Sequence, residues 1–93
     1  MRNIFIVDAM IIDANGTFGR PEGYPKTFDS KHYGDDVDKT FRRADGDMSD
    51  VWGAMCKVDT RQIQTVELKD IFGNQYGKKT MGNFPSESEE PMT

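Results

Sequence analysis

Three aspartates crowd the segment after a predicted helix and are the first candidates for metal chemistry: Asp45, Asp47 and Asp50. Carboxylates two residues apart open the calcium-binding loop of an EF-hand. With Asp45 in first place, the sixth position, which requires glycine, is Asp50, and the twelfth, which requires glutamate, is Cys56. The spacing therefore rejects an EF-hand, and the segment is predicted to be a solvated loop at the helix exit.

Soft metal ligands and nucleophiles are scarce, because the chain has one histidine, His32, and one cysteine, Cys56. A structural zinc site takes about four such ligands, and a cysteine nucleophile takes a histidine adjacent in space. Cys56 alternates with apolar residues and is predicted to be a small buried residue. The chain also lacks a phosphate-binding glycine loop and a nucleophile motif. We therefore expect no enzyme activity, no cofactor and no metal.

A surface for single-stranded nucleic acid is the strongest chemical candidate. Such surfaces interleave exposed aromatic rings with basic side chains on a sheet. Residues 51–85 hold five bases against three acids. The contacts predicted there are Lys57, Lys69, Tyr76, Lys78 and Lys79. The platform exists if Tyr76, Lys78 and Thr80 share the solvated sheet face; the alternative is ordinary strand surface.

The distribution of charge leaves a second class of partner open. The net charge of −4 includes three glutamates in residues 86–93, so the rest of the chain carries only −1. A body near neutrality lacks the clustered bases that duplex DNA binding requires. A small basic group, Lys39, Arg42 and Arg43, falls where a predicted helix ends, and the helix dipole explains it equally well. The acidic helix start and tail instead suit a protein-interaction or host-modulating factor that binds a basic partner.

The first element that positions these residues is a strand over Asn3–Ile12, rich in β-branched residues. Its apolar run is nearly continuous, which predicts a strand covered on both faces, with Asp8 in need of a hydrogen-bond donor. A turn and a short strand from Thr17–Phe18 follow. Residues 19–26 contain two glycines and two prolines and are predicted to be irregular.

A helix is predicted over Lys31–Ala44, with Asp29 or Ser30 as its N-cap and Gly46 just past its end. A β-hairpin is predicted over Ser49–Asp70, with its turn at Asp59-Thr60. Its first arm alternates through Trp52, Ala54, Cys56 and Val58, and its second carries Val66 and Leu68. Trp52 and Cys56 are therefore predicted to lie in the core, under Val37 and Phe41 of the helix. A last strand is predicted over Gln75–Met81.

These elements predict an α+β fold in the order β-β-α-β-β-β. A mainly antiparallel sheet of four to five strands carries one helix on one face, and polar alternates such as Gln64, Lys69 and Lys78 indicate a solvated second face. Residues 1–85 are predicted to form this single domain, and residues 86–93 a disordered acidic tail. Strands Asn3–Ile12 and Gln75–Met81 are the candidate sheet edges, and a thin core in a short chain favours a homodimer.

Two runs of the sequence, GYPKTFDSKHYGDDVDKTFRRADGD and DVWGAMCKVDTRQIQTV, resemble small accessory proteins of single-stranded DNA bacteriophages of the microvirus type. The opening run IFIVDAMIIDANGTF fits the same resemblance, which covers residues 1–85. The resemblance implies a non-structural protein of the bacterial-host cytoplasm, acting in genome handling, packaging or host interaction. It assigns no functional residue. A single cysteine and the lack of an export signal agree with a reducing cytoplasm and no membrane.

Overall fold

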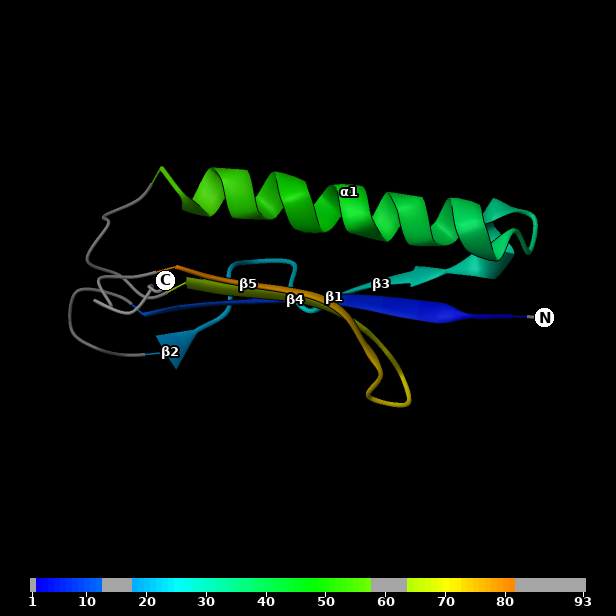
Figure 1. The fold of residues 1–93 in the computed structure, drawn as a ribbon, viewed down its shortest axis with the longest axis horizontal. Helices are drawn as coiled ribbons and strands as arrows, with labels where there is room; N and C mark the ends of the chain where they lie inside the picture. Colours follow the sequence, from blue (N-terminus) through cyan, green and yellow to red (C-terminus); the bar gives the residue numbers. More distant parts are fainter. Residues whose placement is uncertain (1, 13–17, 58–63, 82–93) are drawn as a thin grey trace, which may run out of the picture.

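The computed structural model describes residues 2–12, 18–57 and 64–81, which form one antiparallel sheet with a helix packed on one face (Figure 1). The predicted α+β class is confirmed. The elements in chain order are β1 (Ile4–Ile12), β2 (Phe18–Gly19), β3 (Lys26–Asp29), the 3-10 turn η1 (Ser30–Tyr33), α1 (Val37–Met55), β4 (Gln64–Asp70) and β5 (Gln75–Met81). Among these residues, no helix is long and apolar enough to cross a bilayer.

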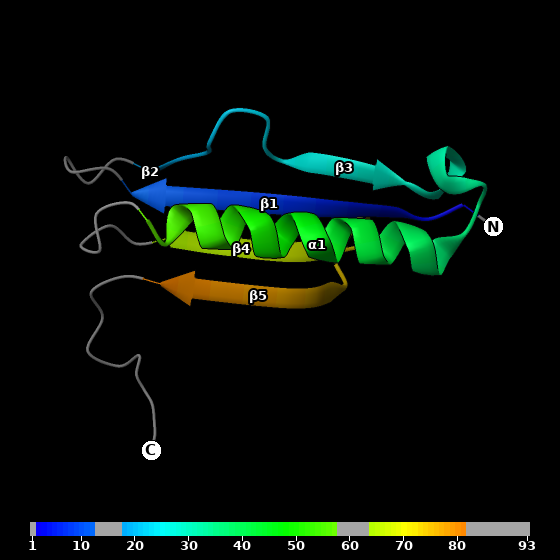
Figure 2. The same cartoon turned by 90° about the horizontal axis from the view of Figure 1, so that it is seen from above.

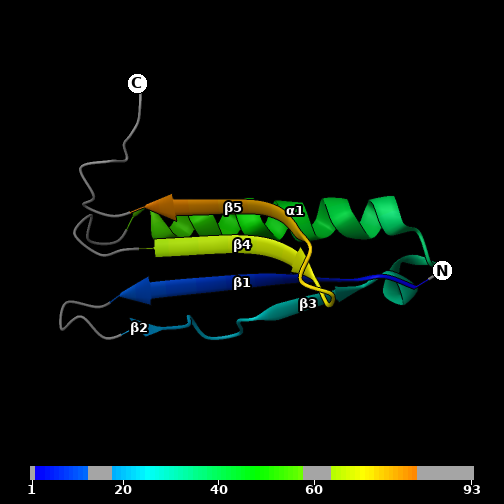
Figure 3. The ribbon, with the colours of Figure 1, turned by 60° about the horizontal axis from the view of Figure 1, so that its bottom comes forward.

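Strand β1 lies at the centre of the sheet. It pairs with β2 and β3 along one side and with β4 along the other, and β5 pairs with β4 (Figures 2 and 3). The prediction of Asn3–Ile12 as an edge was therefore wrong. That of Gln75–Met81 is confirmed, since β5 borders the sheet. Asp8 finds its donor in Arg20, whose guanidinium lies 2.8 Å from the carboxylate.

The hydrophobic core lies between the sheet and α1, which lies above β1 and β4 and runs lengthwise along them (Figure 2). The strands contribute the buried side chains Phe5, Val7, Ala9, Phe28, Val66 and Leu68. The helix contributes Ala44, Met48 and Met55, with Val37, Phe41, Val51 and Trp52 partly buried beside them. The predicted packing of Val37 and Phe41 over the sheet is confirmed.

Helix α1 continues well past its predicted end. Asp36 caps it by accepting a hydrogen bond from the Lys39 amide at 3.0 Å. The predicted stop at Ala44 and the predicted loop after it were wrong, because Met48 and Met55 continue the apolar face at helical spacing. Burying two methionines outweighs the roughly 1 kcal/mol that Gly46 costs inside a helix.

The first arm of the predicted hairpin therefore belongs to α1. Trp52 packs against the core from the helix, and Cys56, predicted to be buried, is exposed at the helix end. The order along the chain is thus three strands, a helix and two strands, in place of β-β-α-β-β-β. Val58 and the predicted turn at Asp59-Thr60 lie outside the described residues, as do residues 82–85 of the predicted domain and the predicted tail.

Two smaller predictions also fail on residues of the sheet. Strand β3 was not predicted; it begins at Lys26, the last residue of the segment predicted to be irregular, and its Phe28 pairs with Phe5 of β1. Gln64, predicted to face solvent, is fully buried on the side that faces the helix. The short second strand is confirmed as β2.

The apolar sequence of β1 predicted cover on both faces, yet the helix covers only one (Figure 1). Phe5, Val7 and Ala9 are buried beneath α1, whereas their neighbours on the opposite face keep intermediate exposure. Those neighbours include Ile4, Ile6, Met10 and Ile12. We call the sheet face that carries them the outer face.

Candidate functional site

The turn between β4 and β5 is held rigid by one carboxylate. Oδ1 of Asp70 accepts hydrogen bonds from the amides of Phe72 at 2.8 Å and Asn74 at 2.9 Å. Its Oδ2 accepts from the Asn74 side chain at 2.9 Å and from the Tyr76 hydroxyl at 3.0 Å. Desolvation is the largest single influence on the pKa of Asp70 and raises it. The hydrogen bonds together outweigh desolvation, so the pKa of Asp70 is lowered from its usual value. Gly73 supplies the positive φ, 88°, that closes the turn.

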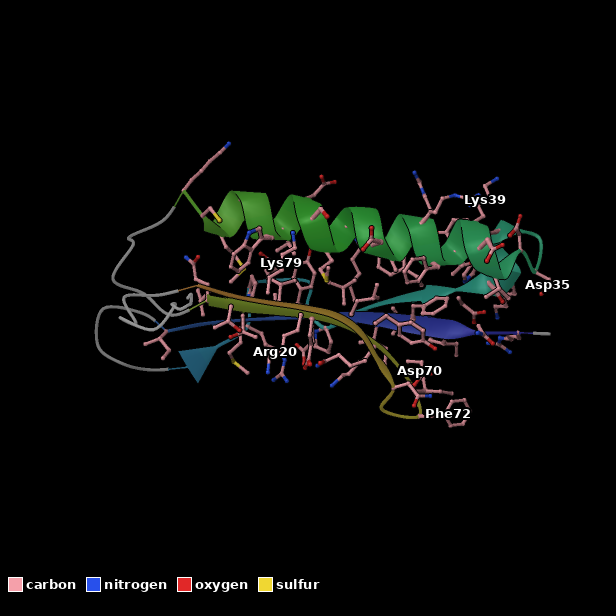
Figure 4. The ribbon with its side chains drawn as sticks, viewed as in Figure 1. Arg20, Asp35, Lys39, Asp70, Phe72 and Lys79 are labelled. Carbon is pink, nitrogen blue, oxygen red and sulfur yellow. The ribbon has the colours of Figure 1, made fainter. Side chains whose placement is uncertain are left out.

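This rigid turn presents two large apolar side chains to water. Phe72 is 83% exposed and Ile71 is 55% exposed. The end of the hairpin curls away from the helix, so that Phe72 lies on the side of the outer face (Figures 1 and 4). We call Ile71 and Phe72 the hairpin tip.

A hollow of about 310 Å³ adjoins the hairpin tip. Its walls come from the start of β1 and from the tip itself, and the residues are Arg2, Asn3, Ile4, Asp70, Ile71 and Phe72. Its lining is mainly apolar, with Asp70 as the one acid and Arg2 as the one base. The hollow therefore suits the binding of a hydrophobic side chain better than catalysis. The sequence contained a signal for it, since two bulky apolar residues inside a turn have no partner within the turn.

Two cations of the outer face are already paired with carboxylates. Arg20 contacts Asp8 at 2.8 Å, and Lys69 lies 3.7 Å from Glu67. At the sheet end, Arg2 contacts Asp29 at 2.6 Å. The hydrogen bond from Arg2 lowers the pKa of Asp29 to about 2, and that from Arg20 lowers the pKa of Asp8.

The five residues predicted to bind nucleic acid do not gather on one surface. Lys57 follows the end of α1, where its amide donates to Ala54 at 3.2 Å. Lys69 and Lys78 lie on the outer face, since their strand positions alternate with the buried residues. Lys79 pairs with Val66 and lies on the helix side of the sheet (Figure 4).

The nucleic-acid platform required Tyr76 to share a face with Lys78 and Thr80, and this condition is not met. A β-bulge opposite Leu68 and Lys69 leaves Tyr76 as the extra residue of β5. Its ring turns to the helix side, 5.3 Å from the ring of Phe5 and 6.0 Å from that of Phe41. The sheet therefore offers no flat row of an aromatic ring between lysines.

A second hollow, of about 430 Å³, lies between α1 and β3. We call it the helix–β3 hollow. The strand side carries Lys26 and Phe28, η1 contributes Tyr33, and the helix carries Arg42, Arg43, Gly46, Asp47 and Asp50. Asp47 accepts hydrogen bonds from the Tyr24 hydroxyl at 3.0 Å and from Lys26 Nζ at 3.1 Å. Burial and then the bond to Asp47 raise the pKa of Tyr24 to about 12.

The candidates for metal and nucleophile chemistry are not brought together. His32 lies in η1 before α1 and Cys56 lies just after it, so about 28 Å of helix separates them. Within the described residues, no group of three His, Cys, Asp or Glu side chains is placed to hold a metal ion. Asp45 and Asp47 are helical rather than members of a calcium loop.

Comparison with known proteins adds no assignment. No protein-family model, curated protein or solved structure matches the chain. The resemblance to accessory proteins of single-stranded DNA phages therefore stays a prediction.

Proposed function

We propose that this chain is a non-enzymatic accessory protein that acts through protein–protein contact, and that it pairs with a second copy of itself through the outer face and the hairpin tip. One observation carries the proposal: Phe72, 83% exposed, is held out beside a hollow of about 310 Å³. Exposed, ordered apolar side chains beside a hollow are typical of protein interfaces.

The composition of β1 supports the same surface. A strand with apolar residues on both faces is typical of a sheet covered on both sides. In a single chain, Ile4, Ile6 and Met10 keep intermediate exposure on the outer face. A second copy seated there supplies the missing cover.

A twofold axis suits this patch because it contains both a protrusion and a hollow. In an isologous pair the same residues meet in both directions. Phe72 of each copy then enters the hollow of the other, beside Ile4. Burying most of one phenyl ring contributes roughly 2 kcal/mol per copy, and a stable interface needs about 800 Å² on each side, which requires the outer face as well as the tip.

The charges of the outer face favour face-to-face contact. Arg20 and Lys69 enter the interface with their own carboxylates, Asp8 and Glu67, and Lys78 lies on the border strand β5 opposite Glu67, so little uncompensated charge is buried. Contact through the free edge at β5 is disfavoured, because Lys78 and Lys79 of two copies would approach one another there.

The mass in solution tests the proposal. Sedimentation velocity over a hundredfold range of concentration is expected to give a dimer that dissociates on dilution. Phe72→Asp is expected to weaken association at least tenfold without unfolding, since the side chain is exposed. Lys39→Gln, on the exposed side of α1, is the matched control and is expected to leave the dimer unchanged. A monomer at every concentration, or a dimer indifferent to Phe72→Asp, overturns the proposal.

The phage-type role in a bacterial cytoplasm rests on the sequence resemblance alone and belongs to this proposal only as its biological setting. Binding of single-stranded DNA by the sheet is less well supported. Its cations are paired or face different sides, and Tyr76 is turned toward the core.

A further inference from the structure

The helix–β3 hollow lies on the helix side of the sheet, away from the hairpin tip, and its basic wall has no structural explanation. Arg42 and Arg43 are exposed and line the hollow, and neither forms an ion pair with a carboxylate of the described residues. The sequence suggested that the dipole at a helix end accounts for them. Because α1 continues to Met55, this explanation fails.

The helix dipole gives these two arginines no support. Arg42 and Arg43 are the sixth and seventh residues of a helix that begins at Val37, so they lie beyond its first turn and far from its C-terminal end. Lys39 lies three and four residues before them and repels both, whereas Asp38 lies four residues before Arg42 and attracts it. The helix itself therefore does not account for the pair, and two adjacent arginines beside a hollow suit a binding surface for an anion.

The acids of the hollow do not cancel this charge. Asp47 is already bound by the Tyr24 hydroxyl and by Lys26 Nζ, at 3.0 and 3.1 Å. Asp50 is the other carboxylate of the lining and comes two helical turns after Arg43. The hollow therefore has a positive end at the arginines and a weakly acidic end at Asp50.

Aromatic surface and free space complete the hollow. Tyr33 and Phe28 contribute rings to its lining, and the Phe28 ring already has Lys26 Nζ 5.7 Å from its centre. Tyr33 is the ring left for a ligand. Gly46 lies inside a helix, where glycine lowers stability, yet a Cβ at this position would meet no atom within 4 Å. The missing side chain of Gly46 leaves open space beside the arginines.

We propose that the helix–β3 hollow binds a nucleoside phosphate, with the phosphate at Arg42 and Arg43 and the base against Tyr33. A volume of about 430 Å³ is within the range of small-ligand sites. Arginine binds phosphate through paired N–H donors, and an aromatic ring stacks on any base. The unit can come from a single strand of nucleic acid or from a free nucleotide, which share this chemistry.

The test uses the full chain and two probes, a fluorescein-labelled strand of ten thymidines and free thymidine monophosphate, at 50 and 200 mM NaCl. The strand is followed by fluorescence anisotropy and the nucleotide by calorimetry. The double substitution Arg42→Gln with Arg43→Gln is expected to weaken binding at least tenfold, and Tyr33→Leu several-fold. The matched control is Lys78→Gln with Lys79→Gln, which removes the same charge from β5 and is expected to leave affinity unchanged.

Each outcome supports or overturns the proposal. If the double arginine substitution abolishes binding of the strand, and the monophosphate does not bind, the site is supported with nucleic acid as its source. Loss of monophosphate binding with the arginine pair supports it with a free nucleotide. Absence of binding by either probe at 50 mM NaCl overturns the proposal. So does affinity that falls with the β5 lysines and not with the arginines, because the sheet would then be the binding surface.

Discussion

Gln64 is a costly residue of the core, and its replacement is predicted to stabilise the protein. Its side chain is fully buried on the helix side of β4, and neither its amide oxygen nor its amide nitrogen has a hydrogen-bond partner among the described residues. A buried polar atom without a partner costs about 1–3 kcal/mol. Methionine has a similar length and volume, and a volume-conserving change costs less than about 1.5 kcal/mol in packing.

The expected net effect of Gln64→Met follows from these two quantities. Two unsatisfied atoms at about 1–3 kcal/mol each are removed and a packing loss of less than about 1.5 kcal/mol is added, so the free energy of unfolding should rise by at least about 0.5 kcal/mol. For a domain of this size, 1 kcal/mol corresponds to about 4–8 °C in Tm. Thermal unfolding followed by circular dichroism should therefore show a rise of at least about 2 °C.

Two further variants separate this reasoning from a general effect of added methionine. Gln75→Met, at an exposed position of β5, should change stability by less than about 0.5 kcal/mol. Gln64→Glu should destabilise the protein, and more so at neutral pH than at pH 4, because a buried carboxyl group costs far more free energy when it is charged than when it is protonated. A fall in Tm for Gln64→Met would refute the account and would mean that the amide has a hydrogen-bond partner in the folded protein.

Three other predictions concern the core, an ion pair and the helix. Leu68→Ala should lower the free energy of unfolding by about 2–5 kcal/mol in urea titrations, whereas Ile71→Ala, at an exposed position, should cost less than about 0.5 kcal/mol. Arg2→Gln should return the pKa of Asp29 from about 2 toward its usual value, as read from carboxyl NMR shifts. Because the Asp29 pKa is depressed on folding, its contribution is present above about pH 4 and is lost as the pH falls toward 2, so the variant should lose less stability over that window. Gly46→Ala should raise the free energy of unfolding by about 0.5–1 kcal/mol, because the added methyl group meets no atom; a loss would show that α1 is strained there.

The sequence was sufficient to predict the class of the fold, because the strongest patterns were local. The apolar run of β1 and the alternation of Val66 and Leu68 in β4 both identified strands that the structure contains. Gly73, whose φ is 88°, is a local signal of the same kind for the turn between β4 and β5. Each of these signals depends on neighbours in the chain and not on the rest of the fold.

The helix end could not be predicted in the same way. Gly46 predicts the end of a helix, and the alternation from Trp52 to Cys56 predicts a strand. The spacing of Ala44, Met48 and Met55 fits a continuing helix equally well. Packing of Met48 and Met55 against the sheet decides between the two patterns, and that information is tertiary.

The candidate sites were predicted less well for a related reason. The sequence gathered Tyr76 with Lys78 by assuming a regular strand, but the bulge in β5 turns the ring to the other side. The basic group at Arg42 and Arg43 was recognised from the sequence and attributed to the dipole at a helix end. This interpretation does not hold, because α1 continues to Met55. The exposure of Phe72 depends on the way Asp70 shapes the turn, which no periodicity describes.

The central place of β1 has a consequence for synthesis. On the ribosome, β1 emerges before its partner β4, and Asp8 pairs with Glu67 across nearly sixty residues of chain. Until β4 has emerged, one edge of an apolar strand stays unpaired, and an unpaired edge promotes association between nascent chains. The strand at the middle of the finished sheet is therefore among the last to be completed, and a delay in translation between Met55 and Gln64 prolongs the interval in which the chain is most prone to aggregate.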